Sequence, residues 1–351
     1  MGRPTGAAEI DAASQMAAEA GESPEVIARQ LGRNAAVAAE IGRRLRQARP
    51  RALLTLARGS SDNAATYARY LIETRCGVIT ASAPPSVSSV YQSALDLKGA
   101  VLIAFSQSGR SPDLIAAAER ARAEGALVIT LVNVDGSPLA EAADFAIPLH
   151  AGAERSVAAT KSFAASLAAA AQLTAHWAED GRILAALAVL PEAAGRALAL
   201  DWPELVAALV DIRSLYVIGR GVGLAAAQEA ALKLKELCGL HAEALSAAEL
   251  RHGPIALVGR GFPVLAFVQD DESRSGVEAA AEACAAQGAQ VFQAGGEPRR
   301  GVIGLETAWA PAELQPIVQT LTFYRMAEAL ARARGFDPDQ PPHLAKVTRT
   351  L

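Results

Sequence analysis

The sequence lacks the charge features of proteins that bind nucleic acids or membrane surfaces. Its 351 residues carry a formal net charge of −4, and only 20% of them are charged. There is neither a basic stripe nor an acidic tail, so the chain has no electrostatic footprint for nucleic acid or for a membrane surface. The expected partner is therefore a small molecule.

Cysteine is also scarce. The three cysteines, Cys76, Cys238 and Cys284, are far apart and have no histidine pairs nearby. An odd number at such spacing argues against a disulfide framework and against a zinc site. This usage predicts a protein of the reducing cytoplasm.

Long apolar runs are missing as well. The N-terminus is polar and alanine-rich and lacks the apolar region of a signal peptide. The alanine-rich stretch 163–178 is interrupted by Gln172 and His176 and is too short to span a bilayer. The sequence predicts neither a signal peptide nor a transmembrane helix, which agrees with a cytoplasmic location.

Lysine is the rarest charged residue, because only five of the 33 basic residues are lysine. They are Lys98, Lys161, Lys233, Lys235 and Lys346. Where arginine carries the surface charge, a retained lysine is a candidate for a titratable or nucleophilic amine, which arginine cannot supply. Chance retention is an equal alternative for any single one.

What is present in quantity is apolar patterning. With 51% hydrophobic residues, the chain has material for two cores. Residues 1–48 read as helical, with an apolar spacing through Val26, Ile27, Leu31 and Val37. Strands then alternate with helices, which predicts an α/β protein with a parallel sheet covered by helices on both faces. The predicted strands of the first half are 52–56, 77–81, 101–105, 126–132 and 145–148.

The second half repeats this plan. LLTLARGSSDNAATYARYL, from Leu53, aligns with LYVIGRGVGLAAAQEAALKL, from Leu215, at an offset of 162. VLIAFSQS, from Val101, aligns with VLAFVQDD, from Val264, at an offset of 163. Two nearly equal offsets predict an internal duplication of an α/β domain. We expect a helical arm at 1–48, a first domain at 49–195 and a second at 196–351.

Hydroxyl side chains gather at the turns of the first half only. The stretch SQSGRSPDLI, from Ser106, follows a buried strand and begins a helix. Ligands of open parallel sheets bind at the carboxyl ends of strands, where helix N-termini offer free N–H groups. This pattern favours a phosphate site, and the alternative is that the serines only cap helices. The residues of the predicted site are Ser60, Ser61, Ser106, Gln107, Ser108 and Ser111.

A second polar cluster lies in ALKLKELCGLHAEALSAAELRHGP, from Ala231. Lys233 and Glu236 are three residues apart and share a helical face. A carboxylate beside an ammonium group in a cleft can move protons on carbon, and His252 is suited to proton transfer near neutral pH. The alternatives are a surface ion pair and a capping or core histidine. Lys346, in the proline-rich C-terminal stretch, is the only lysine after residue 235.

With these residues assembled, the chain resembles the sugar isomerase (SIS) family from about residue 20 to its end. The motifs are ARGSSDNAATYARYLIE, SQSGRSPDL, SVAATKSFAASL, ALKLKELCGLHAEALSAAELRHGP and HLAKVTRTL. The resemblance implies two tandem SIS subdomains, each a flavodoxin-like three-layer α/β/α unit. It also implies a homodimer with shared active sites.

The resemblance assigns roles to the same residues. Glu236 falls on the acid/base that moves a proton between C1 and C2, with Lys233 beside it. His252 falls on the ring-opening histidine, which in the family comes from the partner subunit. Lys346 falls on the lysine of a C-terminal active-site loop that forms an imine with the open-chain ketose. The serines and Gln107 fall on the phosphate site, and Val157 and Ala159 on the segment lining the sugar.

Departures from the family pattern narrow the activity. The chain is similar to the isomerase half of glucosamine-6-phosphate synthase, yet it begins without the glutamine-hydrolysing domain, so glutamine is not the expected ammonia source. Arg58, Arg110 and Ala159 replace residues usual in the synthase. ARGSSDNA and SQSGRSPD resemble the stand-alone SIS-type glucosamine-6-phosphate deaminases, whose chemistry requires neither metal nor cofactor.

Three alternatives stay open at this point. One is an isomerase or deaminase of another phosphosugar, such as galactosamine 6-phosphate. Another is an ammonia-dependent synthase that runs the same reaction backwards. The third is a phosphosugar sensor without catalysis, against which the retained Glu236, His252 and Lys346 argue, as does the lack of a helix-turn-helix segment.

Overall fold

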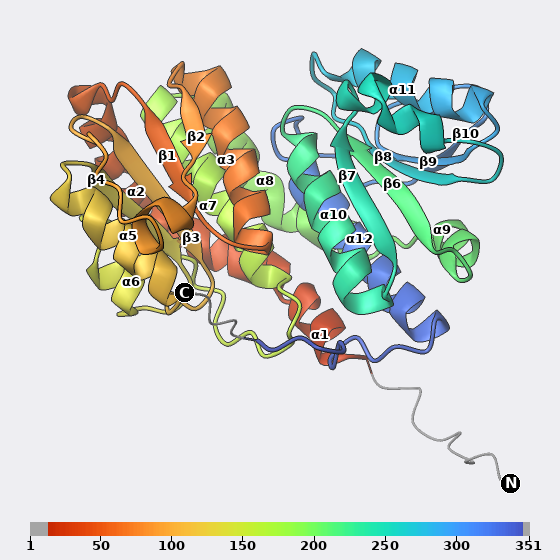
Figure 1. The fold of residues 1–351 in the computed structure, drawn as a ribbon, viewed down its shortest axis with the longest axis horizontal. Helices are drawn as coiled ribbons and strands as arrows, with labels where there is room; N and C mark the ends of the chain where they lie inside the picture. Colours follow the sequence, from red (N-terminus) through yellow and green to blue (C-terminus); the bar gives the residue numbers. More distant parts are fainter. Residues whose placement is uncertain (1–12, 347–351) are drawn as a thin grey trace, which may run out of the picture.

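The computed structural model describes residues 13–346 and contains two five-stranded parallel sheets (Figure 1). The first sheet has the order β2-β1-β3-β4-β5 and the second the order β10-β9-β8-β6-β7. In chain order their strands are β1 (Leu53–Leu56), β2 (Thr80–Ser82), β3 (Val101–Ser106), β4 (Leu127–Val132), β5 (Phe145–Pro148), β6 (Ser214–Gly219), β7 (His241–Ser246), β8 (Pro263–Phe267), β9 (Gln290–Ala294) and β10 (Val302–Leu305).

The two sheets have the same topology. If β6 is matched with β1, β7 with β2 and β8 with β3, both sheets follow the flavodoxin-like order 2-1-3-4-5. Register agrees to within one residue. Leu53 of β1 pairs with Val101 of β3, whereas Val264 of β8 pairs with Tyr216 of β6, one residue after the equivalent of Leu53. The tandem α/β architecture predicted from the sequence repeat is confirmed.

Helices cover both faces of each sheet. Their bounds are α1 (Gln15–Gly21), α2 (Ser23–Ala48), α3 (Ser60–Cys76), α4 (Pro85–Ser89), α5 (Pro112–Ala123), α6 (Pro138–Glu141), α7 (Lys161–Ala178), α8 (Gly181–Leu198), α9 (Pro203–Leu209), α10 (Gly223–Cys238), α11 (Arg274–Ala286) and α12 (Gln315–Ala333), with 3₁₀ turns at Glu249–His252 and Pro254–Leu257.

A single apolar core joins the two halves. It unites α2, α3, α7 and α8 with α10 and α12, while smaller cores lie under α5 on the first sheet and under α11 on the second. Figure 1 shows α3 and α10 between the two sheets, and these equivalent helices pack against each other. The carboxyl ends of β1 and β3 therefore open beside α10.

Local signals explain where these elements begin and end. All residues of β3 are buried, as expected of a central strand covered on both faces. Asp180 caps α8 by accepting the N–H groups of Arg182 and Ile183. Gly77, with φ at 66°, ends α3 in the left-handed conformation that glycine tolerates. Because the chain is still turning there, β2 begins at Thr80, three residues later than predicted.

The N-terminal helices pack onto the first half. Arg29 and Asn34 of α2 donate to the backbone carbonyls of His150 and Pro148, after and within β5. A Cβ at Gly42 would lie 2.8 Å from the backbone of His176, so glycine permits α2 to approach α7 closely. Residues 1–12 of the predicted arm lie outside the described residues.

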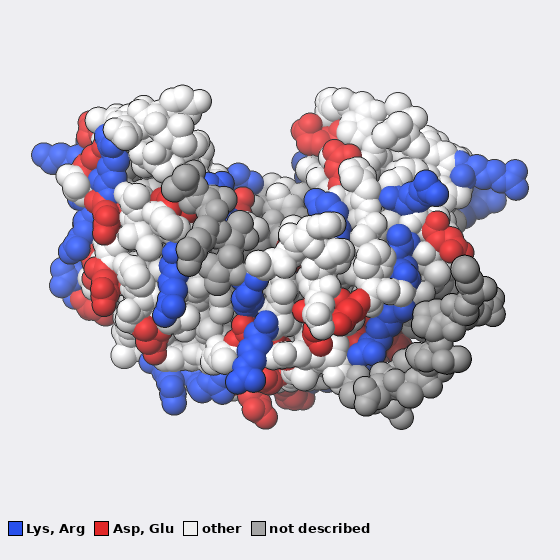
Figure 2. Space-filling view, turned by 60° about the horizontal axis from the view of Figure 1, so that its bottom comes forward, with Lys and Arg blue, Asp and Glu red and all other residues white. Residues whose placement is uncertain are grey.

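Charges are mixed over the face drawn in Figure 2, where basic and acidic side chains alternate without a broad area of one sign. Within residues 13–346, no single helix combines the length and apolarity needed to cross a bilayer. α8 and α9 pass that test only as a pair, with a bend of 57° between them.

Candidate active site

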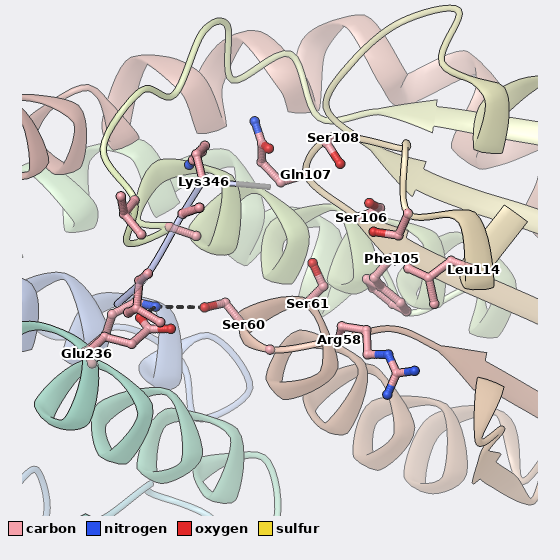
Figure 3. A pocket seen from close by; sticks show the side chains of 17 residues that line it. Arg58, Ser60, Ser61, Phe105, Ser106, Gln107, Ser108, Leu114, Glu236 and Lys346 are labelled. Carbon is pink, nitrogen blue, oxygen red and sulfur yellow. Dashed lines mark hydrogen bonds and ion pairs between the residues drawn. The ribbon is translucent and has the colours of Figure 1, made fainter. Parts of the chain in front are cut away.

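A cavity of about 310 Å³ lies where the first sheet meets α10 and the C-terminal segment (Figure 3). All of the site residues predicted from the sequence line it, with the exception of His252. The lining residues are Arg58, Gly59, Ser60, Ser61, Phe105, Ser106, Gln107, Ser108, Ser111, Leu114, Val157, Ala159, Lys233, Glu236, Leu344, Ala345 and Lys346.

Two turns form the hydroxyl-rich wall. Gly59, with φ at 57°, leads from β1 into α3, so Ser60 and Ser61 form the first turn of that helix. Ser106 ends β3, and its Oγ accepts the N–H of Gly109 at 3.0 Å, which folds the next turn back on itself. Hydroxyls and helix N-termini that converge on one space are suited to bind an anion such as phosphate.

The ammonium group of Lys233, in α10, lies next to the turn that carries Ser60. Its side chain is only 1% exposed and its Nζ lies 2.8 Å from Glu236 Oε2 and 3.2 Å from Glu229 Oε1. It also donates to Ser60 Oγ at 2.9 Å. Burial opposes the charge on the amine, but the two carboxylates outweigh it and raise the pKa of Lys233. The alternative of a surface ion pair is thus wrong for Lys233.

Glu229 is a functional candidate that the sequence reasoning missed. Its carboxylate is fully buried and accepts hydrogen bonds from Ser60 at 3.1 Å, Asn63 at 2.9 Å and Tyr324 at 3.0 Å. It thereby links α3, α10 and α12 beneath the cavity. The signal was available, since Glu229, Lys233 and Glu236 recur at helical spacing on one face.

Glu236 differs from Glu229 in its access to the cavity. Its side chain is 23% exposed and lines the cavity beside Ser60, whereas Glu229 does not reach it. The ammonium of Lys233 holds one carboxylate oxygen at 2.8 Å and leaves the other without a partner among the described hydrogen bonds. A carboxylate so placed can take a proton from a bound ligand and return it.

Lys346 reaches the same cavity from the C-terminal segment. Its Nζ lies 3.3 Å from Oε2 of Glu154, whose side chain is fully buried. Glu154 also accepts hydrogen bonds from the N–H of Thr160 and from Ser162 at the start of α7. The sequence indicated Lys346 but not Glu154, because a partner 192 residues away leaves no local pattern.

His252 is the predicted residue that the cavity lacks. It lies exposed in the 3₁₀ turn Glu249–His252 and is not among the lining residues. An exposed position is compatible with service in a neighbouring molecule. The shared active site therefore stays a prediction.

Arg58 adds a positive charge beside the hydroxyl-rich wall. Its guanidinium donates to Oδ2 of the buried Asp113 at 2.6 and 3.1 Å, and its side chain is half exposed. Asp113 belongs to the first turn of α5, so this ion pair joins the two turns of the wall. Among residues 13–346, no group of three histidine, cysteine or acidic side chains is arranged to hold a metal ion.

Similarity to known proteins identifies the family of this chain. The SIS domain model matches residues 44–176 and 208–292. A glutamine–fructose-6-phosphate aminotransferase [isomerizing] of Aeropyrum pernix is 36% identical over 321 residues, which cover 84% of this chain and 50% of that protein. The chain spans about half the length of the curated relatives it matches.

Solved structures agree with this match. A Silicibacter pomeroyi protein named as a candidate phosphosugar isomerase is 44% identical, with a TM-score of 0.89 over 93% of this chain and 100% of that one. Glucosamine-6-phosphate deaminase of Thermotoga maritima shares the fold, with a TM-score of 0.74 over 96% and 100% of the two chains at 22% identity. The chain belongs to the SIS domain family.

Proposed function

We propose that the protein is a glucosamine-6-phosphate deaminase, which converts glucosamine 6-phosphate and water to fructose 6-phosphate and ammonia. The observation that carries this proposal is the cavity itself. It brings the Glu236 carboxylate, held by Lys233, and two hydroxyl-rich turns together in a volume of about 310 Å³. A phosphate at the turns would bring the reacting end of a sugar towards Glu236.

Binding would begin with the phosphate. Ser61, Ser106, Ser108 and Ser111 offer hydroxyls, and the N-termini of α3 and α5 offer backbone N–H groups. Arg58 supplies charge at the same wall. The sugar would then extend along Val157 and Ala159 towards α10.

Proton transfer would follow ring opening, for which we assign His252 of the partner subunit. Glu236 removes the proton from C2 of the open-chain aldose, and the electron pair forms the C1–C2 double bond of an enolamine. The aldehyde oxygen gains negative charge that the ammonium of Lys233 stabilises. Glu236 returns the proton to C1 and one amine proton passes to O1, which leaves a hydroxyl at C1 and an imine at C2. Water adds to this imine, and ammonia leaves as the C2 carbonyl forms.

Lys346 takes no obligatory step in this scheme. Its amine is positioned at the cavity and can exchange with the C2 imine, but hydrolysis by water alone completes the reaction. Its ion pair with Glu154 keeps the amine at the cavity wall. We assign it a supporting role in holding or exchanging the imine.

Three substitutions support the deaminase over the synthase. Arg58, Arg110 and Ala159 stand where the synthase has other residues, and two of these, Arg58 and Ala159, line the cavity. The curated relatives are named glutamine–fructose-6-phosphate aminotransferase, which is another name for glucosamine-6-phosphate synthase. The choice between deaminase and synthase therefore depends on these positions.

The test is product analysis with purified protein. Glucosamine 6-phosphate, galactosamine 6-phosphate and N-acetylglucosamine 6-phosphate are incubated in parallel, and ammonia and ketose phosphate are measured. We expect both products from glucosamine 6-phosphate and from neither of the others. Products from galactosamine 6-phosphate alone would identify that sugar as the substrate instead. If none of the three sugars released ammonia, the deaminase assignment would be rejected.

A further inference from the structure

Helix α1 contacts both segments that close one side of the cavity. In Figure 1 it lies at the lower edge of the molecule, beside the dark-blue C-terminal segment. The N–H groups of Gln15 and Met16 donate to the two carboxylate oxygens of Asp339, at 2.7 and 2.8 Å. Asp339 precedes Lys346 in the segment that reaches the cavity, so the first turn of α1 anchors that segment.

The same helix holds the loop that lines the sugar end of the cavity. Glu19 is only 4% exposed. One carboxylate oxygen accepts the N–H of Arg155 at 2.5 Å, and the other accepts the N–H and the hydroxyl of Ser156 at 3.1 and 2.5 Å. Val157, the next residue, lines the cavity. Glu19 thus fixes the backbone directly before the lining residues.

A second ion pair holds the far end of this loop. Glu22, which follows α1, accepts a hydrogen bond at 2.7 Å from Lys161, whose side chain is 2% exposed. Lys161 is the first residue of α7, and Ala159 lies two residues before it. The loop is therefore held on both sides by carboxylates from one short region of the chain.

The strength of these contacts follows from charge and burial. Hydrogen bonds to an ionised carboxylate are roughly twice as strong as neutral ones. Burial acts to raise the pKa of Glu19, but hydrogen bonds from Arg155 and Ser156 outweigh it and lower that pKa, so the group is ionised at neutral pH. The loop N–H groups would lose their partners if the carboxylate were removed.

We propose that Glu19 is a positioning residue of the candidate active site, whose carboxylate sets the loop that carries Val157 and Ala159. The helix that bears it holds the segment of Lys346 at the same time. This inference rests on the proposed function for its kinetic consequence, but its structural consequence is independent of any activity.

The first test is limited proteolysis with trypsin. Arg155 is exposed, yet Glu19 holds its peptide backbone. In Glu19→Gln, which keeps the size of the side chain but removes its charge, we expect cleavage after Arg155 to be on the order of tenfold faster than in the wild type. Glu40→Gln, at an exposed carboxylate of α2, serves as the matched control and should cleave as the wild type does. Equal cleavage in Glu19→Gln, or a uniform increase at all arginines, would overturn the proposal.

The second test separates binding from chemistry. A misplaced lining loop weakens ground state and transition state alike, so Glu19→Gln should raise KM about tenfold with kcat within about twofold of the wild type. Glu19→Asp should recover part of the loss. An unchanged KM, or a loss confined to kcat, would contradict the positioning role. If the wild type releases no ammonia, the proposed function fails while the proteolysis result still decides this inference.

Discussion

Lys233 is the residue on which the charge balance of the cavity depends. It is a buried cation between the fully buried Glu229 and the partly exposed Glu236. Removing one partner of a buried pair leaves an uncompensated charge, which costs more than the pair itself contributes. The amine therefore supports the fold as well as the proposed chemistry.

We predict that Lys233→Met lowers the free energy of unfolding by on the order of 3 kcal/mol, because Glu229 loses its buried counter-ion. Urea denaturation of both proteins measures the difference. Lys235→Met, at an exposed position two residues along α10, should change stability by less than about 0.5 kcal/mol. A similar loss of unfolding free energy in both variants would show that the buried ion pair does not stabilise the fold more than an exposed lysine does.

The same pair predicts how stability depends on pH. Because the folded state raises the pKa of Lys233 above its usual value of 10.5, its contribution is fully present below pH 10.5. It is lost as the pH rises through the raised pKa. The stability difference between the wild type and Lys233→Met should thus be constant from pH 7 to about 10 and shrink only above that range.

What the sequence could predict of these residues depends on distance along the chain. Lys233 and Glu236 are neighbours on one helix, and the serines follow predicted strands, so local patterns pointed to them. Glu154 and Glu19 were missed because their partners come from remote segments, and an acidic residue in isolation predicts an exposed one. For His252, the residue type suggested proton transfer, but its assignment to ring opening and to the partner subunit came from the family resemblance.

Among the structural elements, the turn after β3 requires a glycine, because its backbone has a positive φ and packs closely against its neighbours. Gly109 has φ at 63°, and a Cβ there would lie 2.1 Å from Ser137 Oγ and 2.9 Å from a methyl group of Val132. The N–H of Leu139 also donates to its carbonyl at 3.1 Å. The turn that presents Ser108 to the cavity is thus packed against the loop after β4.

We predict that Gly109→Ala raises KM for the phosphosugar at least tenfold, because the displaced turn moves the hydroxyls that bind phosphate. Gly136→Ala is a closely matched control, since Gly136 also has φ at 63° but nothing lies within 4 Å of its Cβ position. Both variants bear the strain of a positive φ, about 1 kcal/mol. Steady-state kinetics with equal KM in the two variants would contradict a phosphate role for this turn.

Strands and helices as such were predictable to a large extent. The central strands β1, β3 and β4 are apolar runs and lie within a residue of their predicted bounds. The edge strand β2 is three residues long and two of them are exposed, so apolar patterning did not define its start. Residue propensities also gave no account of the loop 150–160, because its contacts come from Glu19 of α1 and from Glu22, which follows that helix.

For the molecule as a whole, the two halves of the duplication differ in the side chains at the ends of their central strands. By the repeat offset, Gln269 corresponds to Ser106 and Gly223 to Ser61. A Cβ on Gly223 would lie 1.8 Å from the Gln269 side-chain oxygen, so this glutamine fills the equivalent space. Gln319 accepts its amide N–H at 2.7 Å and holds it there. Where the first half presents the Ser106 hydroxyl, the second half thus has the buried amide of Gln269.

The expected sharing of active sites in a homodimer can be tested by combining two inactive variants. His252→Ala and Glu236→Gln should each be inactive alone, if His252 serves the cavity of the partner subunit. Co-expression should restore about a quarter of wild-type activity, since about half of the dimers are mixed and each has one intact site of two. Ammonia release from the purified mixture is the measurement. No recovery in mixed dimers confirmed by two affinity tags would place both residues in one subunit or reject the role of His252.

In the proposed reaction, Glu236 moves the proton whose transfer leads to ammonia release. The most direct measurement is the rate of ammonia and fructose 6-phosphate formation from glucosamine 6-phosphate by the wild type and by Glu236→Gln, with substrate binding measured in parallel by calorimetry. We predict a fall in kcat of at least about a thousandfold, with binding retained, because an amide cannot accept the C2 proton. Turnover by Glu236→Gln at the wild-type rate would rule out Glu236 as the group that moves this proton.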